Sequence, residues 1–196
     1  MMNRTKKIAM LGIFAAISIA LALLIRFPIF PAVADLIYEP ADVPILVIGF
    51  ALGPAAGLAV TCIVAILMAL LTGLGGPFGA LMHFLATGAL VGTASVIYGK
   101  HHTKSGAVLA LAAGTLAMTL VMIPANLILT PIFYGMYGWS TAKVMSVIWW
   151  IIAFNLVKAG INSTITFLLY KRVVGFVRGA ALTRRHGRQV AEKTSL

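Results

Sequence analysis

Two polar side chains interrupt the last long apolar run of this sequence, Val144 to Tyr170. Asn155 and Lys158 are three residues apart, which places both on one face of a helix, about one turn apart. A lysine in a bilayer core is costly and normally faces a protein-lined cavity that serves a ligand or an ion. Together the pair could bind the polar edge of a planar ligand. The alternative has Lys158 extending to the membrane interface, which is hardest from the middle of a run.

Three other side chains in the apolar runs are candidates for ligand contact, and each has a structural alternative. Asn126, which follows Pro124 closely, adds a second buried amide, although a lone asparagine in a membrane helix is as often a bond between helices. Met82 suits the face of a flat ligand, but methionine also fills gaps in a core. His83 has no cysteine or carboxylate near it in sequence, so we expect a structural histidine rather than a metal ligand.

The residues needed for enzyme chemistry are scarce. The chain has 4 acidic residues, three of them in one loop and the last in the tail, which leaves little for metal catalysis. Ser163 lacks a glycine-rich setting for an oxyanion, and the sequence has no nucleotide-binding loop. The single cysteine, Cys62, excludes an internal disulfide and a multi-cysteine metal site. We therefore expect neither an enzyme nor an ATPase, with no metal and no resident cofactor.

The composition is that of an integral membrane protein. Hydrophobic residues make up 61% of the 196 residues and charged residues 10%, with a mean hydropathy of +1.05. This leaves too little polar surface for a soluble domain of that size. The net charge of +11 comes from short basic clusters between apolar runs, a pattern typical of membrane topology and not of nucleic-acid binding. No small-residue cleavage site follows the first run, so we expect it to remain a span.

A helix needs about 20 apolar residues to cross a bilayer, and the sequence predicts an all-α bundle of six transmembrane helices. The predicted spans are Ile8–Ile25, Val43–Leu52, Ala55–Leu74, Phe78–Tyr98, Gly106–Tyr134 and Val144–Arg172. The second span is too short to cross alone, so we expect it to be extended or buried between its neighbours. Gly53-Pro54 then forms a tight turn into the third span. Residues 1–178 would form the transmembrane domain and residues 179–196 a basic tail.

Basic residues orient the spans. They precede the first span, follow the fourth and follow the sixth, as Arg4, Lys6, Lys7, Lys100, Lys104, Lys171, Arg172, Arg178, Arg184, Arg185, Arg188 and Lys193. With six spans these all lie on one side, which the positive-inside rule makes cytoplasmic. We therefore expect a multi-pass protein of the cell membrane with both termini in the cytoplasm and a tail that is solvated or touches anionic headgroups.

The opposite side carries three notable loops. Arg26 to Asp42 contains three acidic residues, several aromatic residues and several prolines, a composition that favours a structured lid or pocket wall over a mobile connection. Gly73 to Gly79 is glycine-rich and permits close backbone approach. Tyr134 to Trp139 is aromatic, which either an interfacial belt or a binding site would explain. With the buried polar residues, these loops suggest a pocket that opens outward.

Four stretches, in order along the chain, resemble one known family. They are YEPADVPILVIGFALGPAAG (Tyr38 to Gly57), GGPFGALMHFLATG (Gly75 to Gly88), IPANLILTPIFYG (Ile123 to Gly135) and FNLVK (Phe154 to Lys158). These resemble the substrate-binding S subunits of energy-coupling factor (ECF) vitamin transporters, and most closely the riboflavin-specific branch. The resemblance covers about Lys7 to Arg178, nearly the whole chain.

The resemblance implies a six-helix subunit that binds riboflavin from outside and joins a transmembrane T subunit and two cytoplasmic ATPases. In this family an asparagine and a lysine of the last span, an asparagine of the fifth and the first loop contact the flavin. The predicted ligand contacts are therefore Leu36, Tyr38, Asp42, Gly79, Met82, Asn126, Asn155 and Lys158. His83 departs from the asparagine that the riboflavin-specific branch would lead us to expect.

The first span supplies a predicted docking face. Gly12, Ala16 and Ala20 recur at intervals of four, and such small residues let another helix approach closely. Spacing alone fits packing within the bundle equally well, but the resemblance implies that this stripe meets the T subunit.

Two other interpretations stay open from the sequence. The first is the same architecture with another vitamin, such as thiamine or biotin as the ligand. A cationic ligand such as thiamine would argue for buried carboxylates, and the predicted spans contain none. The second is a structural or assembly protein of the membrane, which would have no need of a buried lysine.

Overall fold

Helices account for every long apolar run, because backbone groups at membrane depth must find their hydrogen-bond partners within the protein. The computed structural model describes residues 4–73 and 75–194, with side chains up to residue 175. In that part of the chain five helices are long and apolar enough to cross a membrane. They are α1 (Arg4–Leu24), α3 (Pro54–Thr72), α4 (Gly76–Lys100), α5 (Lys104–Tyr134) and α7 (Ile148–Thr194).

The second predicted span is the short helix α2 (Asp42–Leu52), which lies in the middle of the bundle. Every residue from Asp42 to Phe50 is buried, and α2 contacts α1, α3, α4 and α7. Its length covers only about half of a bilayer core of about 30 Å, so it serves as a core element between the longer helices. The prediction of a short, buried second segment is confirmed.

The turn from α2 into α3 also follows the prediction. Gly53 has φ +94°, a conformation that favours glycine, and Pro54 takes the first position of α3. The single residue Gly53 therefore suffices to reverse the chain direction between α2 and α3.

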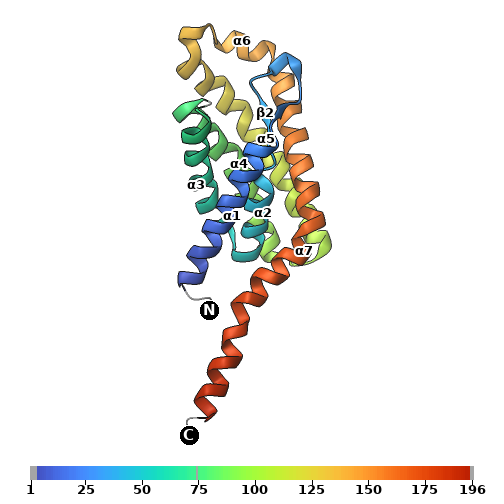
Figure 1. The fold of residues 1–196 in the computed structure, drawn as a ribbon. Coiled ribbons are helices and arrows are strands. Elements are labelled where there is room, and N and C mark those ends of the chain that lie inside the picture. Colours follow the sequence, from blue (N-terminus) through green and yellow to red (C-terminus); the bar gives the residue numbers. More distant parts are fainter. Residues whose placement is uncertain (1–3, 74, 195–196) are drawn as a thin grey trace.

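The two ends of the molecule differ. The start of α1 and the end of α7 lie at one end, and the β-hairpin of residues 27–38 and the short helix α6 (Thr141–Ser146) lie at the other (Figure 1). The segment after α1 contains β1 (Phe27–Pro28), the 3-10 helix η1 (Pro31–Val33) and β2 (Ile37–Tyr38), with Phe27 paired to Tyr38 and Pro28 to Ile37 in an antiparallel ladder. This segment is structured, as its prolines predicted.

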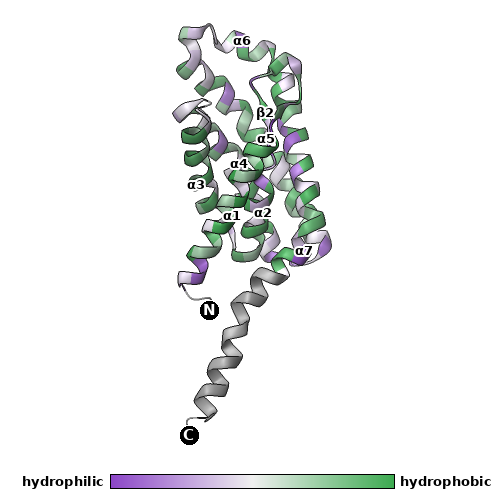
Figure 2. Cartoon of the chain, in the orientation of Figure 1, coloured by the Kyte–Doolittle hydropathy of each residue, from purple (hydrophilic) through white to green (hydrophobic). Residues whose placement is uncertain are grey.

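The last predicted span begins differently from the expectation. Residues after α5 form η2 (Gly135–Tyr137) and the short helix α6 (Thr141–Ser146), and α7 starts only at Ile148. The backbone of α7 continues to Thr194, so the segment predicted as a separate tail extends the same helix. Figure 2 shows that the sides of the bundle are mostly hydrophobic, with hydrophilic residues at the start of α1.

Close helix contacts hold the end near the chain termini. Phe50 of α2 stacks on Tyr98 of α4 with ring centroids 4.1 Å apart, and Tyr170 of α7 meets both rings edge-on. Between α4 and α5, a Cβ at Gly114 would lie only 2.6 Å from the backbone oxygen of Leu90. Small residues of this kind let membrane helices approach closely.

The close approach at Gly114 predicts a stability effect. Replacing Gly114 with alanine should force α4 and α5 apart, and overpacking of this kind costs about 1–3 kcal/mol. We expect a lower thermal unfolding midpoint for the Gly114→Ala protein in detergent. Gly160→Ala on α7 is the matched control, because a Cβ there meets nothing within 4 Å. Equal midpoints for the two variants would contradict close packing at Gly114.

Candidate ligand-binding site

A cavity of about 500 Å³ lies between the hairpin segment, the first turns of α4, the second half of α5 and the first turns of α7. Its wall is mainly apolar, with methionine and aromatic side chains around a few polar groups. The residues that line it are Arg26, Val33, Ala34, Asp35, Leu36, Ile37, Glu39, Gly75, Phe78, Gly79, Met82, His83, Ala86, Met118, Met122, Asn126, Thr130, Tyr134, Trp139, Val144, Val147, Ile151, Phe154, Asn155 and Lys158. The cavity therefore belongs to the end away from the chain termini.

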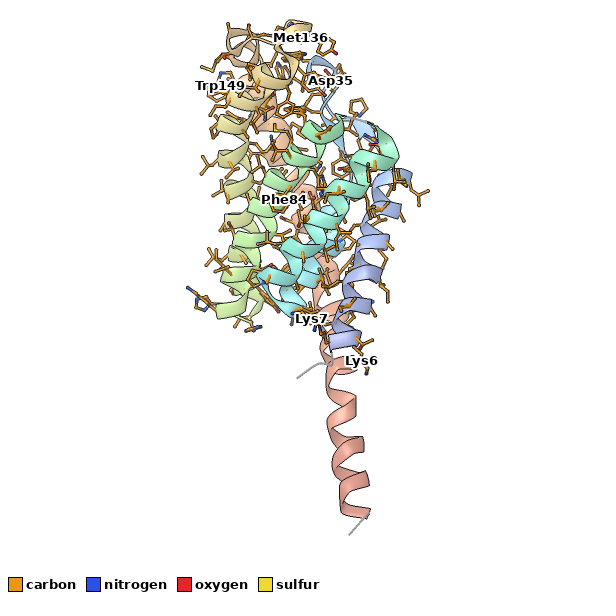
Figure 3. The ribbon with its side chains drawn as sticks, turned by 90° about the vertical axis from the view of Figure 1, so that its left-hand side faces the viewer. Lys6, Lys7, Asp35, Phe84, Met136 and Trp149 are labelled. Carbon is orange, nitrogen blue, oxygen red and sulfur yellow. The ribbon has the colours of Figure 1, made fainter. Side chains whose placement is uncertain are left out.

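Figure 3 places this end relative to the basic one. Asp35, which lines the cavity, lies at the same end as Met136 and Trp149, while Lys6 and Lys7 lie at the other end. The separation agrees with the predicted asymmetry between a basic side and a loop-rich side.

Glu39 is the polar centre of the cavity. Lys158 Nζ lies 3.7 Å from Glu39 Oε1, and His83 Nδ1 lies 3.3 Å from the same oxygen. Burial alone would raise the pKa of Glu39, but the Lys158 ammonium, the hydrogen bond and charge of His83 and the Arg26 guanidinium together lower that pKa to about 2. Glu39 is therefore ionised at neutral pH and supplies the counter-charge that a buried lysine requires.

The two predicted amides face the cavity from different helices. Asn155 Nδ2 donates to the Ile151 carbonyl of α7 at 2.8 Å, and Asn126 Nδ2 donates to the Met122 carbonyl of α5 at 2.8 Å. Each of these bonds uses one of the two N–H groups of an amide. The other N–H of each side chain is available to a ligand, and the local bond to the helix fixes the orientation of the amide.

A second polar cluster lies beside the cavity. Asp42 Oδ1 accepts a hydrogen bond from Thr87 Oγ1 at 2.7 Å, and Oδ2 accepts one from Asn162 Nδ2 at 2.8 Å. The hydroxyl of Tyr38 donates to Asn162 Oδ1 at 3.0 Å. Burial and the Asp42 carboxylate raise the pKa of Tyr38, so its hydroxyl keeps its proton and acts as the donor.

The structure brings together most of the residues predicted as ligand contacts. Leu36, Gly79, Met82, Asn126, Asn155 and Lys158 all line the cavity. Tyr38 and Asp42 are not among the lining residues and belong instead to the cluster around Asn162. Contact between ligand and these residues stays a prediction, since the cavity shows only which side chains a ligand could reach.

The predicted spans contain no carboxylate, but two acids just before the second span are buried in the bundle. Glu39 is 8% exposed and Asp42 is fully buried. The physical reason is that the chain after α1 folds back into the bundle, so that Tyr38 to Asp42 leads inward to α2. If residues 26–42 formed a loop on the membrane surface, Glu39 and Asp42 would both be in contact with water.

Sequence reasoning left open which acid would meet Lys158, and it did not identify Asn162, Thr87 and His83 as partners of these acids. Asn162 follows Lys158 by four residues and Asn155 by seven, so all three lie on one face of α7. That spacing was the available signal for Asn162. Nothing in the sequence indicated that Thr87 and His83 of α4 would meet Asp42 and Glu39, because these contacts join residues more than forty positions apart.

The predicted docking residues lie on the outer face of α1. Gly12, Ala16 and Ala20 are exposed, whereas the buried residues of this helix are Ala15, Ser18 and Ala22. The stripe therefore does not pack within this bundle, which was the alternative that spacing left open.

Comparison with known proteins gives concordant matches. Residues 6–170 match the family described as "ECF transporter, substrate-specific component". The chain is 30% identical over 182 residues to "Riboflavin transporter RibU" of Staphylococcus aureus (strain TCH60), covering 90% of this chain and 95% of that protein. It is also 30% identical over 174 residues to "Riboflavin transporter FmnP" of Bacillus subtilis (strain 168), with coverage of 85% and 90%.

A solved structure matches the fold as well. The structure described as "Structure and mechanism of the S component of a bacterial ECF transporter" superposes with a TM-score of 0.75 at 30% identity, covering 89% of this chain and 99% of that one. Family, sequence relatives and fold thus agree over nearly the whole chain. The protein belongs to the family of substrate-specific components of ECF transporters.

Proposed function

We propose that this protein is the riboflavin-binding subunit of an ECF-type importer, and that riboflavin is its transported cargo rather than a resident cofactor. The single observation that carries this proposal is the cavity of about 500 Å³, with two oriented amides and a paired lysine in a mainly apolar wall. Its size is within the range of small-molecule sites. The printed names of the two relatives support the same ligand.

The chemistry of the wall suits a flavin. Isoalloxazine is flat and mostly apolar, with one imide-like edge that both donates and accepts hydrogen bonds. Asn126 and Asn155 can each offer a donor to that edge, and Lys158 can donate to a carbonyl or ribityl oxygen. Met82 and Phe154 line the same cavity and can contact the ring faces.

Charge balance favours a neutral ligand. Two basic side chains with fixed charge, Arg26 and Lys158, and two acidic ones, Asp35 and Glu39, line the cavity. The formal charges of these four side chains cancel, so a cationic vitamin would find no surplus of negative charge. This balance of charges favours riboflavin over thiamine, although the interior contains carboxylates.

We further propose that the protein works with a transmembrane T subunit and two cytoplasmic ATPases. The exposed stripe of Gly12, Ala16 and Ala20 offers a face for helix docking. The basic ends of α1 and α7 would face the cytoplasm, and the cavity would face outward. The protein itself would act as a binding subunit without its own ATPase site.

Riboflavin binding tests the proposed ligand. Protein incubated with riboflavin and repurified should be yellow, and titration should quench the flavin fluorescence. Replacing Lys158 with methionine keeps the length of the side chain but removes its donors. Loss of a charge-assisted hydrogen bond costs about 1.5–3 kcal/mol, so the dissociation constant should rise about ten- to over a hundredfold.

The control for this variant is Lys104→Met, which changes an exposed lysine at the other end of the bundle. It should bind riboflavin like the original protein. A colourless protein with no quenching would overturn the proposed ligand. Equal riboflavin affinities of the Lys158→Met variant and the original protein would show that Lys158 does not contact the ligand.

Energisation gives a separate prediction. Vesicles that contain this chain alone should bind riboflavin without concentrating it, because the protein would depend on partner ATPases. Addition of ATP should change nothing, as measured by retained radiolabelled riboflavin. ATP-dependent accumulation of riboflavin by the chain alone would refute the proposal that transport requires partner ATPases.

The stripe on α1 gives a prediction about assembly. Replacing Ala16 and Ala20 together with tryptophan should prevent co-purification with the T subunit, because a helix could no longer approach closely. Riboflavin affinity should be retained, since neither residue lines the cavity. A double variant that loses riboflavin binding as severely as assembly would show that the stripe supports the bundle itself.

A further inference from the structure

The polar cluster beside the cavity consists of Tyr38, Asp42, Thr87 and Asn162, and we call it the Asp42 cluster. All four residues are buried: Tyr38 is 5% exposed and the other three are 0% exposed. They come from β2, α2, α4 and α7, and none of them lines the cavity. The site described above therefore does not account for them.

Asn162 is the central residue of the Asp42 cluster. Its amide donates to Asp42 Oδ2 at 2.8 Å and to the Glu39 backbone oxygen at 3.3 Å, and it accepts from the Tyr38 hydroxyl at 3.0 Å. All three bonds go to the segment between β2 and the start of α2. Thr87 holds the other oxygen of Asp42 at 2.7 Å from α4, so the segment is tied to two helices.

The same segment forms one wall of the cavity. Leu36, Ile37 and Glu39 line it, and their neighbours Tyr38 and Asp42 belong to the cluster. The backbone oxygen of Glu39 is held by Asn162, while its carboxylate reaches Lys158. The place of the carboxylate in the cavity thus depends on bonds made outside the cavity.

We propose that the Asp42 cluster is a positioning device that holds the wall of Leu36, Ile37 and Glu39 against α7 and thereby slows the release of the bound ligand. Buried polar groups that would be left unsatisfied are costly, so the cluster favours one arrangement of the wall. The prediction about the release rate of riboflavin rests on the proposed function, but the prediction about the position of the wall does not. Both can be measured.

Tyr38→Phe is the mildest test, because it removes one hydroxyl from the wall segment and keeps the ring. With the full-length protein in lipid nanodiscs, we expect riboflavin to dissociate about five- to tenfold faster, as loss of one hydrogen bond implies. Dissociation is followed by the recovery of flavin fluorescence. Tyr98→Phe is the matched control, since Tyr98 is also 5% exposed but lies in the aromatic group near the chain termini.

Thr87→Val tests the cluster from the opposite side. Valine keeps the shape of threonine but cannot donate to Asp42, so release should again be faster. Thr61→Val is its control, because Thr61 is equally buried and its hydroxyl bonds only to the Gly57 carbonyl of its own helix. Both threonine variants should unfold at lower temperature, but only Thr87→Val should change the release rate.

Hydrogen exchange of the ligand-free protein provides the readout that does not depend on riboflavin. The backbone amides of Leu36, Ile37 and Tyr38 should exchange faster in Tyr38→Phe and Thr87→Val than in the original protein and the two controls. If the original protein does not bind riboflavin, the proposed function fails, and exchange alone decides whether the cluster positions the wall. Unchanged exchange at these amides, or an unchanged release rate despite lower thermal stability, would overturn the proposal.

Discussion

The need to neutralise a buried lysine organises the cavity half of this protein. Lys158 lies inside a spanning helix, where an uncompensated charge would be very costly. Its counter-charge, Glu39, comes from a segment that is distant in sequence and must enter the bundle to reach it. The inward path of the residues after α1 brings Glu39 to this lysine, and the Asp42 cluster holds the same segment from outside the cavity.

The two halves of the bundle use different kinds of interaction. Near the chain termini, aromatic ring contacts and a close helix approach join α2, α4, α5 and α7. Around the cavity, the ion pairs of Glu39 with Lys158 and His83 join the segment before α2 to α7 and α4, and the two asparagine amides are oriented by bonds to their own helices. The packed half thus supports a polar half that contains the cavity.

Local patterns predicted much of the candidate site. A lysine and an asparagine one turn apart in an apolar run indicated the cavity-facing side of α7, and the loop rich in proline and acidic residues indicated a pocket wall. The roles of Tyr38 and Asp42 were not predictable in this way, because each depends on Asn162, more than a hundred positions away. His83 was expected to be structural, and its nearness to Glu39 could not be inferred from residues adjacent to it in sequence.

The sequence by itself determined the membrane environment, the helical class and the approximate spans, since these follow from apolar length. The placement of its basic residues predicts the sidedness. The sequence also identified Lys158 as a candidate functional residue, because the cost of burying a charge can be recognised without a structure. Only the tertiary structure decided which acid meets that lysine, which face of α1 is exposed and which polar residues support the wall from outside the cavity. Those outcomes depend on contacts between segments that are distant in sequence, and hydrogen bonds between distant segments produce no periodic pattern in the sequence.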